Sequence, residues 1–297
     1  MAIIGAGPAG IAAAIYLKRA GFEPMVFEKC DVGGLLKNAN LVENYPGFPD
    51  GIGGKVLVQL FKEQLFRLGV EIKNIEVKNV SSESGYFTLA TDEREMISRA
   101  LIVATGTIPK SMEMEGQSHL FGKKLFYEIK DIPPPSREDT FMVIGGGDTA
   151  FDYALNLSGD GARVDIIFRG EIPKCLSLLE ERVRKSPNIH IHPKTVPLAV
   201  DEAGERITIK CISDEKEIKL TSDYALIAVG RSPNLELLPK ESRKTLTIKE
   251  NGGTNIPGLF LAGDVRRGLF RQTGIAVGDG ILCAMSALNF LRGDDEK

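Results

Sequence analysis

Residues 1–36 read MAIIGAGPAGIAAAIYLKRAGFEPMVFEKCDVGGLL. A short apolar strand at 2–4 runs into a glycine-rich turn, then into an alanine-rich helix that ends near Gly21, and then into a second strand at 24–27. A strand, a glycine turn, a helix and a second strand in this order predict a βαβ unit with parallel strands. The stretch therefore places the chain in the α/β class.

The turn of this unit has the spacing of a dinucleotide fingerprint. Gly5 permits the tight turn, Gly7 lets the backbone approach a pyrophosphate, and Gly10 lets the helix pack closely on the strand. The N–H groups at the start of the helix point toward the phosphates. The residues assigned to this cradle are Gly5, Gly7, Pro8, Ala9 and Gly10.

An acid closes the second strand, as a ribose site requires. Glu28 lies 18 residues after Gly10 (28 − 10 = 18), where its carboxylate can accept both ribose hydroxyls. Lys29, Gly34 and Leu35 follow it and are assigned to the same site. The apolar run at the start is broken by glycines and lacks a basic leader, so we expect neither a signal peptide nor a membrane anchor.

Composition restricts the function classes. The chain has 297 residues, enough for about two domains of ordinary size. Its 37 basic and 40 acidic residues give a net charge of −3, which argues against a nucleic-acid partner or an anionic membrane surface. Four widely spaced cysteines form neither a disulfide framework nor a metal motif, and no histidine lies near one of them. We therefore expect no metal site and a cytoplasmic location.

A second unit of the same kind begins at residue 141. A strand at 141–144 enters the turn GGGDTA at 145–150, and a helix at 151–158 leads to a strand at 163–168. Its first glycine lies 140 residues after that of the first unit (145 − 5 = 140), and two such units in one chain are far more specific than one. The residues assigned to this second cradle are Gly145, Gly147, Asp148 and Thr149.

The rest of the chain alternates between helix and strand patterns. Helical spacing predicts helices at 55–69, 178–185 and 275–291. Alternation predicts short antiparallel strands at 70–72, 75–77 and 86–89, and further strands within 188–223. Buried parallel strands that stop beside a ligand end in small residues or an acid, and this pattern occurs at 100–107, 224–230 and 258–265.

Together the motifs resemble those of the two-dinucleotide-domain flavoproteins of the thioredoxin reductase type. The resemblance covers essentially the whole chain, with the motifs in that family's order: GAGPAG at 5–10, ENYPG at 43–47, ATG at 104–106, GGGDTA at 145–150, AVGRSPN at 228–234, LAGDV at 261–265 and RQ at 271–272. It implies an α/β fold of two Rossmann-like three-layer dinucleotide-binding domains. The NAD(P)H-binding domain, 112–233, would be inserted into an FAD-binding domain formed by 1–111 and 234–297. The resemblance also implies a homodimer.

The resemblance implies that FAD lies against residues from both ends of the chain. Asp264, beside a glycine at a strand end, would bond the ribityl hydroxyls. The N–H groups at the start of the last helix would face the flavin pyrimidine, whose oxygen gains negative charge on reduction. Asn44 would lie beside the isoalloxazine ring. The other residues assigned to the two cofactor sites by their motifs are Ala104, Thr105, Gly106, Gly230, Gly263, Arg271, Gln272 and Thr273.

The sequence departs from thioredoxin reductases at their redox centre. Those enzymes carry a Cys-x-x-Cys pair shortly before the second glycine motif, and that spacing falls here on EIKD at 128–131. None of the four cysteines has a partner at redox spacing, so the thiol relay from flavin to a protein disulfide is missing. The region is instead similar to the thioredoxin-reductase-like ferredoxin (flavodoxin)–NADP reductases, which also lack the pair.

The choice of coenzyme depends on the run FRGEIPK at 168–174. NADPH needs cations after the second strand of its unit to hold the 2′-phosphate, whereas NADH favours an acid there. The family's NADPH version has two adjacent arginines and a third a few residues on. This chain keeps Arg169 and Lys174, with Glu171 between them. We therefore expect FAD and NADPH as cofactors, with NADH as the alternative.

These features predict an FAD-dependent NAD(P)H oxidoreductase in which hydride passes between nicotinamide and flavin. The cofactor supplies the chemistry, so no side chain is assigned a catalytic role. The second substrate stays open: a one-electron carrier such as ferredoxin or flavodoxin, oxygen or a quinone, or a disulfide reached by another route. The alternative from a different class is a flavin-binding redox sensor with a decayed nicotinamide site. The run at 168–174, which has fewer cations than the family's NADPH version, favours the sensor. The intact motif at 145–150 argues against it.

Overall fold

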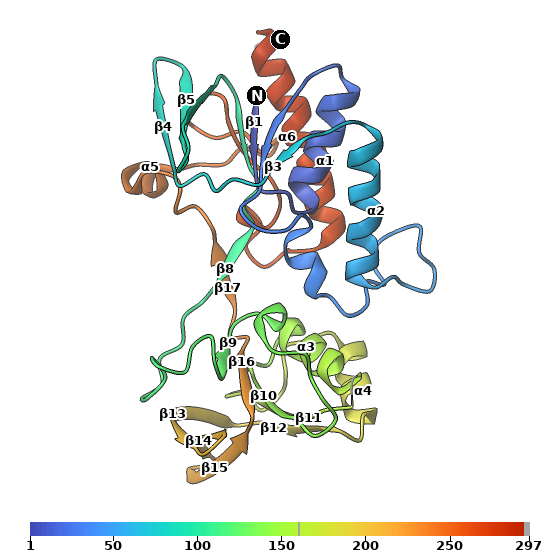
Figure 1. Ribbon diagram of the computed structural model, residues 1–297, viewed down its shortest axis with the longest axis vertical. Helices are drawn as coiled ribbons and strands as arrows, with labels where there is room; N and C mark the ends of the chain where they lie inside the picture. The colour runs from blue at the N-terminus through green and yellow to red at the C-terminus, as the bar shows by residue number, and fades with distance from the viewer. Residues whose placement is uncertain (160, 294–297) are drawn as a thin grey trace. The chain divides into compact units, whose positions relative to one another are not determined.

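The computed structural model describes residues 1–159 and 161–293, and the chain divides into two compact units (Figure 1). Unit 1 comprises Met1–Lys37, Leu41–Ile108 and Ser232–Lys297. Unit 2 comprises Asn38–Asn40 and Pro109–Arg231. The two long boundaries lie close to positions 111 and 233 of the sequence-based division. The assignment of Asn38–Asn40 to unit 2 has no counterpart in that division.

A five-stranded parallel sheet forms the middle layer of unit 1. Its strand order is β18-β7-β1-β2-β3, with the bounds Leu259–Leu261, Leu101–Val103, Ala2–Ile4, Met25–Phe27 and Ile72–Lys73. All neighbours pair in parallel, and Ile3 of β1 lies opposite Val26 and Ile102. Its three central strands are apolar at every position because both faces of the sheet are covered.

Helices cover one face of this sheet, and a small antiparallel sheet covers the other. Ile3 and Ile102 pack with the helices α1 (Pro8–Arg19), α2 (Gly54–Arg67) and α6 (Thr273–Arg292). Their neighbours of opposite parity, Ala2 and Ile4, pack on the other side. The covering strands there are β4 (Asn79–Glu83), β5 (Tyr86–Ala90) and β6 (Glu95–Ser98).

α6 is a core element of unit 1 with an unusually apolar sequence. Among the described residues it is the one helix long and apolar enough to cross a membrane, with a mean hydropathy of 1.6. Core helices of water-soluble proteins pass the same test. The buried face of α6 packs against α1, and a Cβ on Gly280 would lie 2.1 Å from the Ala9 carbonyl oxygen. Glycine at this position therefore permits the two helices to approach closely.

Unit 2 has the same architecture. Its parallel sheet has the order β12-β11-β10-β16-β9, with the bounds Ile189–His192, Arg163–Ile167, Thr140–Ile144, Tyr224–Ile227 and Leu125–Phe126. One face packs with α3 (Asp148–Gly159) and α4 (Ser177–Lys185). The other face packs with the antiparallel strands β13 (Thr195–Ala203), β14 (Arg206–Ser213) and β15 (Lys216–Ser222). Both units are therefore three-layer α/β structures.

The remaining elements are short. They are the 3₁₀ turns η1 (Gly34–Asn38), η2 (Ile129–Asp131) and η3 (Gly263–Val265), the helix α5 (Lys240–Thr245), and the strands β8 (Thr107–Pro109) and β17 (Arg231–Pro233). β8 and β17 pair as a two-stranded sheet. The two long boundaries between the units, at 108/109 and 231/232, fall within these two strands.

Some sequence-based element predictions are wrong. Residues 72–73 form β3, which pairs in parallel with β2 rather than antiparallel, and 75–77 form no strand. Alternation predicts a half-buried strand but not the direction in which it pairs. α3 begins at Asp148 rather than at residue 151. An acid in the first turn interacts favourably with the helix dipole, which is consistent with the earlier start.

Candidate functional site

The first glycine turn is too crowded for side chains at two of its three glycines. Gly5 has φ +101°, and a Cβ on it would lie 2.4 Å from the carbonyl oxygen of Ala104, where β7 ends. A Cβ on Gly10 would lie 1.8 Å from the Gly5 oxygen. Gly7 is the N-cap of α1, and no side chain caps this helix. The nearest atom to a Cβ on Gly7 would be the Gly34 Cα at 4.0 Å, so the helix start is open at this point.

Glu28 at the end of β2 is fixed beside this turn. Its Oε2 accepts the N–H of Ala6 at 2.8 Å, and its Oε1 accepts the N–H of Cys30 at 2.9 Å. Each carboxylate oxygen has a further lone pair, so both can still accept a ribose hydroxyl. The ammonium group of Lys29, assigned to the same site, pairs with Glu76 at 3.3 Å. This part of the site therefore offers a ligand exposed backbone and the carboxylate of Glu28.

Two of the assigned residues meet although 228 positions separate them. The side-chain amide of Asn44 donates a hydrogen bond of 2.8 Å to Oε1 of Gln272. Gln272 is the N-cap of α6, and no side chain caps the helix. The loop at 43–47 therefore lies at the open start of α6, within unit 1.

The strand ends of unit 1 hold the other assigned residues. Thr105 donates a 2.5 Å hydrogen bond to the Asn234 carbonyl, and the Asn234 N–H donates to the Gly106 carbonyl at 3.0 Å. Gly263 has φ +78°, and a Cβ on it would lie 2.8 Å from that of Ala9 at the start of α1. The turn after β18 is therefore packed against the first glycine cradle.

The pattern of unit 1 fits FAD. The cradle is lined by backbone without side chains. Gly7 and Gly34 face each other, and a Cβ on Gly34 would lie 3.3 Å from the Gly7 Cα. Two uncapped helix starts, those of α1 and α6, supply N–H groups for anionic oxygens. Glu28 directly after β2 and Asp264 in η3 after β18 carry carboxylates of the kind that ribose and ribityl hydroxyls need.

Unit 2 repeats the contact seen at Gly5. Gly145 has φ +153°, and a Cβ on it would lie 2.3 Å from the carbonyl oxygen of Ala228, directly after β16. Gly147 has no heavy atom within 4 Å of such a Cβ, so the turn is open there. Asp148 begins α3, and its Oδ1 accepts the N–H of Leu176 at 2.8 Å. The segment after β11 therefore folds back onto the glycine turn.

That segment contains the run expected to choose the coenzyme. The Lys174 N–H donates a 2.6 Å hydrogen bond to the Gly146 carbonyl, while its side chain and that of Arg169 are exposed. The carboxylate of Glu171 pairs with Lys194 at 3.0 Å. A residue outside the run therefore compensates the one acid within it.

Glu128, the first residue of the stretch on which the family's cysteine spacing falls, has a buried carboxylate. Glu128 is 8% exposed and accepts hydrogen bonds from Arg231 Nη1 at 2.6 Å, from the Tyr153 hydroxyl at 2.9 Å and from the Asn38 amide at 2.9 Å. All four residues belong to unit 2. Burial and the charge of Glu128 raise the pKa of Tyr153, which keeps its hydroxyl a donor. Both oxygens of the carboxylate are thus hydrogen-bonded, Oε1 by Arg231 and Oε2 by Tyr153 and Asn38.

The four cysteines are free thiols. Cys211 and Cys283 are buried, and burial raises their pKa values to about 11 and about 12. Burial and the neighbouring carboxylates raise the pKa of Cys175 to about 11. Thiols that stay protonated at neutral pH are poor nucleophiles, so these three are not poised for disulfide exchange.

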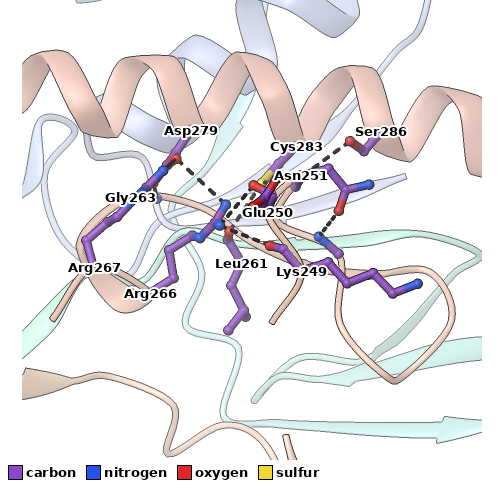
Figure 2. Close-up of polar contacts among 11 residues, drawn as sticks. Lys249, Glu250, Asn251, Leu261, Gly263, Arg266, Arg267, Asp279, Cys283 and Ser286 are labelled. Atoms are coloured by element: carbon purple, nitrogen blue, oxygen red, sulfur yellow. Dashed lines mark hydrogen bonds and ion pairs between the residues drawn. The ribbon is translucent and has the colours of Figure 1, made fainter. Parts of the chain in front are cut away.

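The sequence-based assignment missed three charged residues beside η3, the turn that contains the assigned residues Gly263 and Asp264. Asp279 on α6 is 3% exposed and interacts with Arg266 and Arg267 directly after η3 (Figure 2). A sequence signal did exist. Asp279 is the one acid of α6 and lies four residues before Cys283 and eight before Ala287, on the stripe that faces the core.

Comparison with known proteins identifies the family. Residues 1–280 match the model of the pyridine nucleotide-disulphide oxidoreductases. The chain belongs to this family. This pyridine nucleotide-disulphide oxidoreductase is similar to NADPH-dependent thioredoxin reductase 3 of Arabidopsis thaliana, with 32% identity over 99% of this chain and 58% of that protein. It is also similar to thioredoxin reductase 1 of Saccharomyces cerevisiae, with 31% identity over 97% of both chains.

A solved structure extends the likeness to the fold. The structure of Lactococcus lactis thioredoxin reductase superimposes with a TM-score of 0.90 and 30% identity, covering 98% of both chains. The predicted α/β fold of two dinucleotide-binding domains and the thioredoxin reductase resemblance are confirmed. As a member of this family the protein is an FAD-dependent NAD(P)H oxidoreductase. The chain spans little more than half the length of the Arabidopsis relative.

Proposed function

We propose that unit 1 binds FAD, that unit 2 binds NADPH, and that the electrons leave to a one-electron carrier of the ferredoxin or flavodoxin type. The last step is supported by the buried, hydrogen-bonded Glu128, which stands where the spacing of the thioredoxin reductases would put a redox cysteine. A carboxylate cannot form a disulfide. The electrons that the flavin receives from NADPH therefore cannot leave through a thiol pair at this position.

The residues of unit 1 bind and orient FAD in this proposal. The cradle of Gly5, Gly7 and Gly10 lets the pyrophosphate approach the start of α1, and Glu28 accepts the ribose hydroxyls. Asp264 accepts the ribityl hydroxyls. The uncapped start of α6 supplies N–H groups to the oxygen that becomes more negative when the flavin is reduced.

The bound flavin supplies the hydride and electron chemistry. The hydrogen bond between Asn44 and Gln272 holds an amide beside the helix start that faces the pyrimidine ring. Because no proton has to move to or from a side chain in the hydride step, no acid or base is assigned. The protein contributes orientation, exclusion of water and the field of a helix start.

NADPH rather than NADH is supported by the charges after β11. Arg169 and Lys174 are the cations of this run that can bind the 2′-phosphate. The residue directly after the strand is Phe168 and not the acid that an NADH site favours. The Glu171 carboxylate, which would oppose a phosphate, is compensated by Lys194. Arg169→Ala should therefore raise the KM for NADPH and leave the KM for NADH unchanged.

A homodimer is part of the proposal, with unit 1 as the contact. Between α1, α2 and α6 lies a groove of about 230 Å³ lined by side chains that include Tyr45, Phe61 and Ile281. Beside it, Leu282 and Met285 of α6 are exposed. The family resemblance implies a dimer, and this apolar face is the surface we propose a second copy covers. We also keep the cytoplasm as the proposed location.

The test is an anaerobic titration of the FAD-loaded protein with NADPH and, separately, NADH, following the oxidised-flavin absorbance. We expect NADPH to bleach the flavin with the lower half-saturation. The reduced protein is then mixed with oxidised ferredoxin, flavodoxin, oxygen, a quinone or oxidised thioredoxin. Fast reoxidation by ferredoxin or flavodoxin supports the proposal, and fast reoxidation by thioredoxin refutes it. A flavin that neither coenzyme bleaches would support the redox-sensor alternative instead.

A further inference from the structure

An ion cluster around a buried carboxylate lies behind the turn that follows β18, and its Arg267 side chain is 36% exposed (Figure 2). Asp279, in the interior of α6, is 3% exposed. Arg267 donates two hydrogen bonds to its carboxylate, the one from Nε at 2.8 Å. The Asp279 Oδ2 also accepts the backbone N–H of Gly263 at 3.2 Å. One carboxylate therefore joins α6 to both ends of the segment from Gly263 to Arg267.

A second guanidinium belongs to the same cluster. Arg266 has a side chain only 8% exposed, with Nη1 at 3.7 Å from the Asp279 Oδ1. Its Nη2 donates to the carbonyls of Lys249 and Glu250, each at 3.0 Å. Cys283, one turn after Asp279, donates to the Leu261 carbonyl at 3.2 Å. The residues before and after β18 are thus tied to α6 through polar contacts on one side of that helix.

The cluster leaves a net positive charge. Two guanidinium groups face one carboxylate, and the Cys283 thiol stays protonated because burial raises its pKa to about 12. Buried ion pairs are costly to desolvate and add little to folding stability compared with apolar side chains of similar volume. What such a pair does provide is a fixed geometry, because its partners must keep their hydrogen bonds once buried.

We propose that Asp279 is a positioning residue for FAD, and that the cluster with Arg266 and Arg267 raises the reduction potential of the flavin. Asp279 acts through the Gly263 N–H, which fixes the turn that presents Asp264 to the ribityl chain. It acts also through α6, whose first turn faces the pyrimidine. The excess positive charge stabilises the negative charge that the flavin gains on reduction. This inference rests on the proposed placement of FAD in unit 1.

Two single variants of the FAD-loaded protein test the two effects separately. Asp279→Asn and Arg267→Gln should each weaken FAD binding by about tenfold, because each breaks charged hydrogen bonds that hold the turn. The flavin midpoint potential, measured by equilibration with a reference dye, should shift in opposite directions. It should rise in Asp279→Asn, which removes a negative charge, and fall in Arg267→Gln, which removes a positive one. A purely structural role predicts weaker binding with no such opposite shifts.

The double variant Asp279→Asn/Arg267→Gln covers the case in which a lone buried charge prevents folding. It removes one charge of each sign, so the potential should return to the wild-type value while FAD binding stays weak. Ser286→Ala is the matched control, since Ser286 lies on the same face of α6 and donates only to the Asn251 carbonyl at 3.2 Å. This control should match wild type in both measurements.

The outcomes separate this inference from the proposed function. If the wild-type protein binds no FAD, the placement of FAD itself is wrong. If the wild type binds FAD and is reduced by NADPH, while all three cluster variants keep its affinity and potential, only the role of Asp279 is refuted. Equal shifts of the same sign in the two single variants would refute the charge effect.

Discussion

Asp152 offers a test of the energetics of unit 2. It lies on α3, one turn after Asp148, and accepts the backbone N–H of Asn40 at 3.2 Å. Burial raises its pKa from 3.8 to about 6, the charge of Asp148 adds to the rise, and the Asn40 bond opposes it. At neutral pH the folded protein therefore holds a carboxylate that would be better solvated in the unfolded chain.

The sign and size of the effect follow from the two pKa values. Below pH 3.8 the carboxyl is protonated in both states and costs nothing. The cost grows as the pH rises and is constant above about pH 6. A difference of about two pH units corresponds to about 3 kcal/mol at most. Asp152→Asn keeps an oxygen for the Asn40 N–H, so we expect it to stabilise the protein by up to about 3 kcal/mol at pH 7.5 and about 1 kcal/mol at pH 4.5.

Urea unfolding of the FAD-loaded protein, followed by far-ultraviolet circular dichroism at both pH values, measures this difference. Flavin fluorescence reports unit 1 in the same samples. Asp131→Asn is the matched control, because Asp131 is an exposed acid of the same unit. Equal stabilisation at the two pH values would show that Asp152 does not titrate between them. A loss of stability at pH 7.5 would show that the charged acceptor for the Asn40 N–H stabilises the fold by more than the burial of the charge costs.

Three further predictions concern the cofactor cradle, the buried carboxylate and the dimer. Gly10→Leu should abolish FAD retention, because even a Cβ there would lie 1.8 Å from the Gly5 oxygen; a purified variant with full flavin absorbance would refute the cradle. Glu128→Gln should lower the free energy of unfolding by about 3 kcal/mol, as expected when a buried guanidinium, here that of Arg231, loses its counter-charge; an unchanged melting temperature would contradict this. Met285→Lys should convert a dimer to monomers in light scattering without loss of flavin, whereas a wild-type monomer would refute the dimer itself.

The sequence predicts the two glycine cradles because their geometry is local. Gly5 and Gly145 pack against the carbonyl oxygens of Ala104 and Ala228. Each of these alanines directly follows a parallel strand that an apolar run in the sequence predicts. Local patterns predict less where pairing is decided elsewhere. β3 has two residues and lies at the edge of its sheet, and nothing in its own sequence specifies a parallel neighbour.

Long-range polar contacts limit what could be predicted of the site. Asn44 and Gln272 were both assigned to the flavin site by their motifs, but no pattern indicates that they bond to each other. Arg266 and Arg267 look like ordinary exposed charges in the sequence, since their partner Asp279 comes from a different element. At 128–131 the sequence indicates only that cysteine is absent. The network around Glu128 depends on Asn38 and Arg231, which lie far from it in the chain.

The sheet of unit 1 has a consequence for synthesis on the ribosome. β18, at 259–261, pairs with β7, and α6 covers the same face as α1, so the nascent chain cannot complete this sheet and its helical layer until β18 and α6 have emerged. The strands of unit 2 all lie within 109–231 and are available earlier. During that interval α1 lacks α6 and β7 lacks β18, so both expose apolar surface. A chaperone that binds nascent chains would have its longest opportunity there, and the proposed FAD site would be complete only after translation of the first turn of α6.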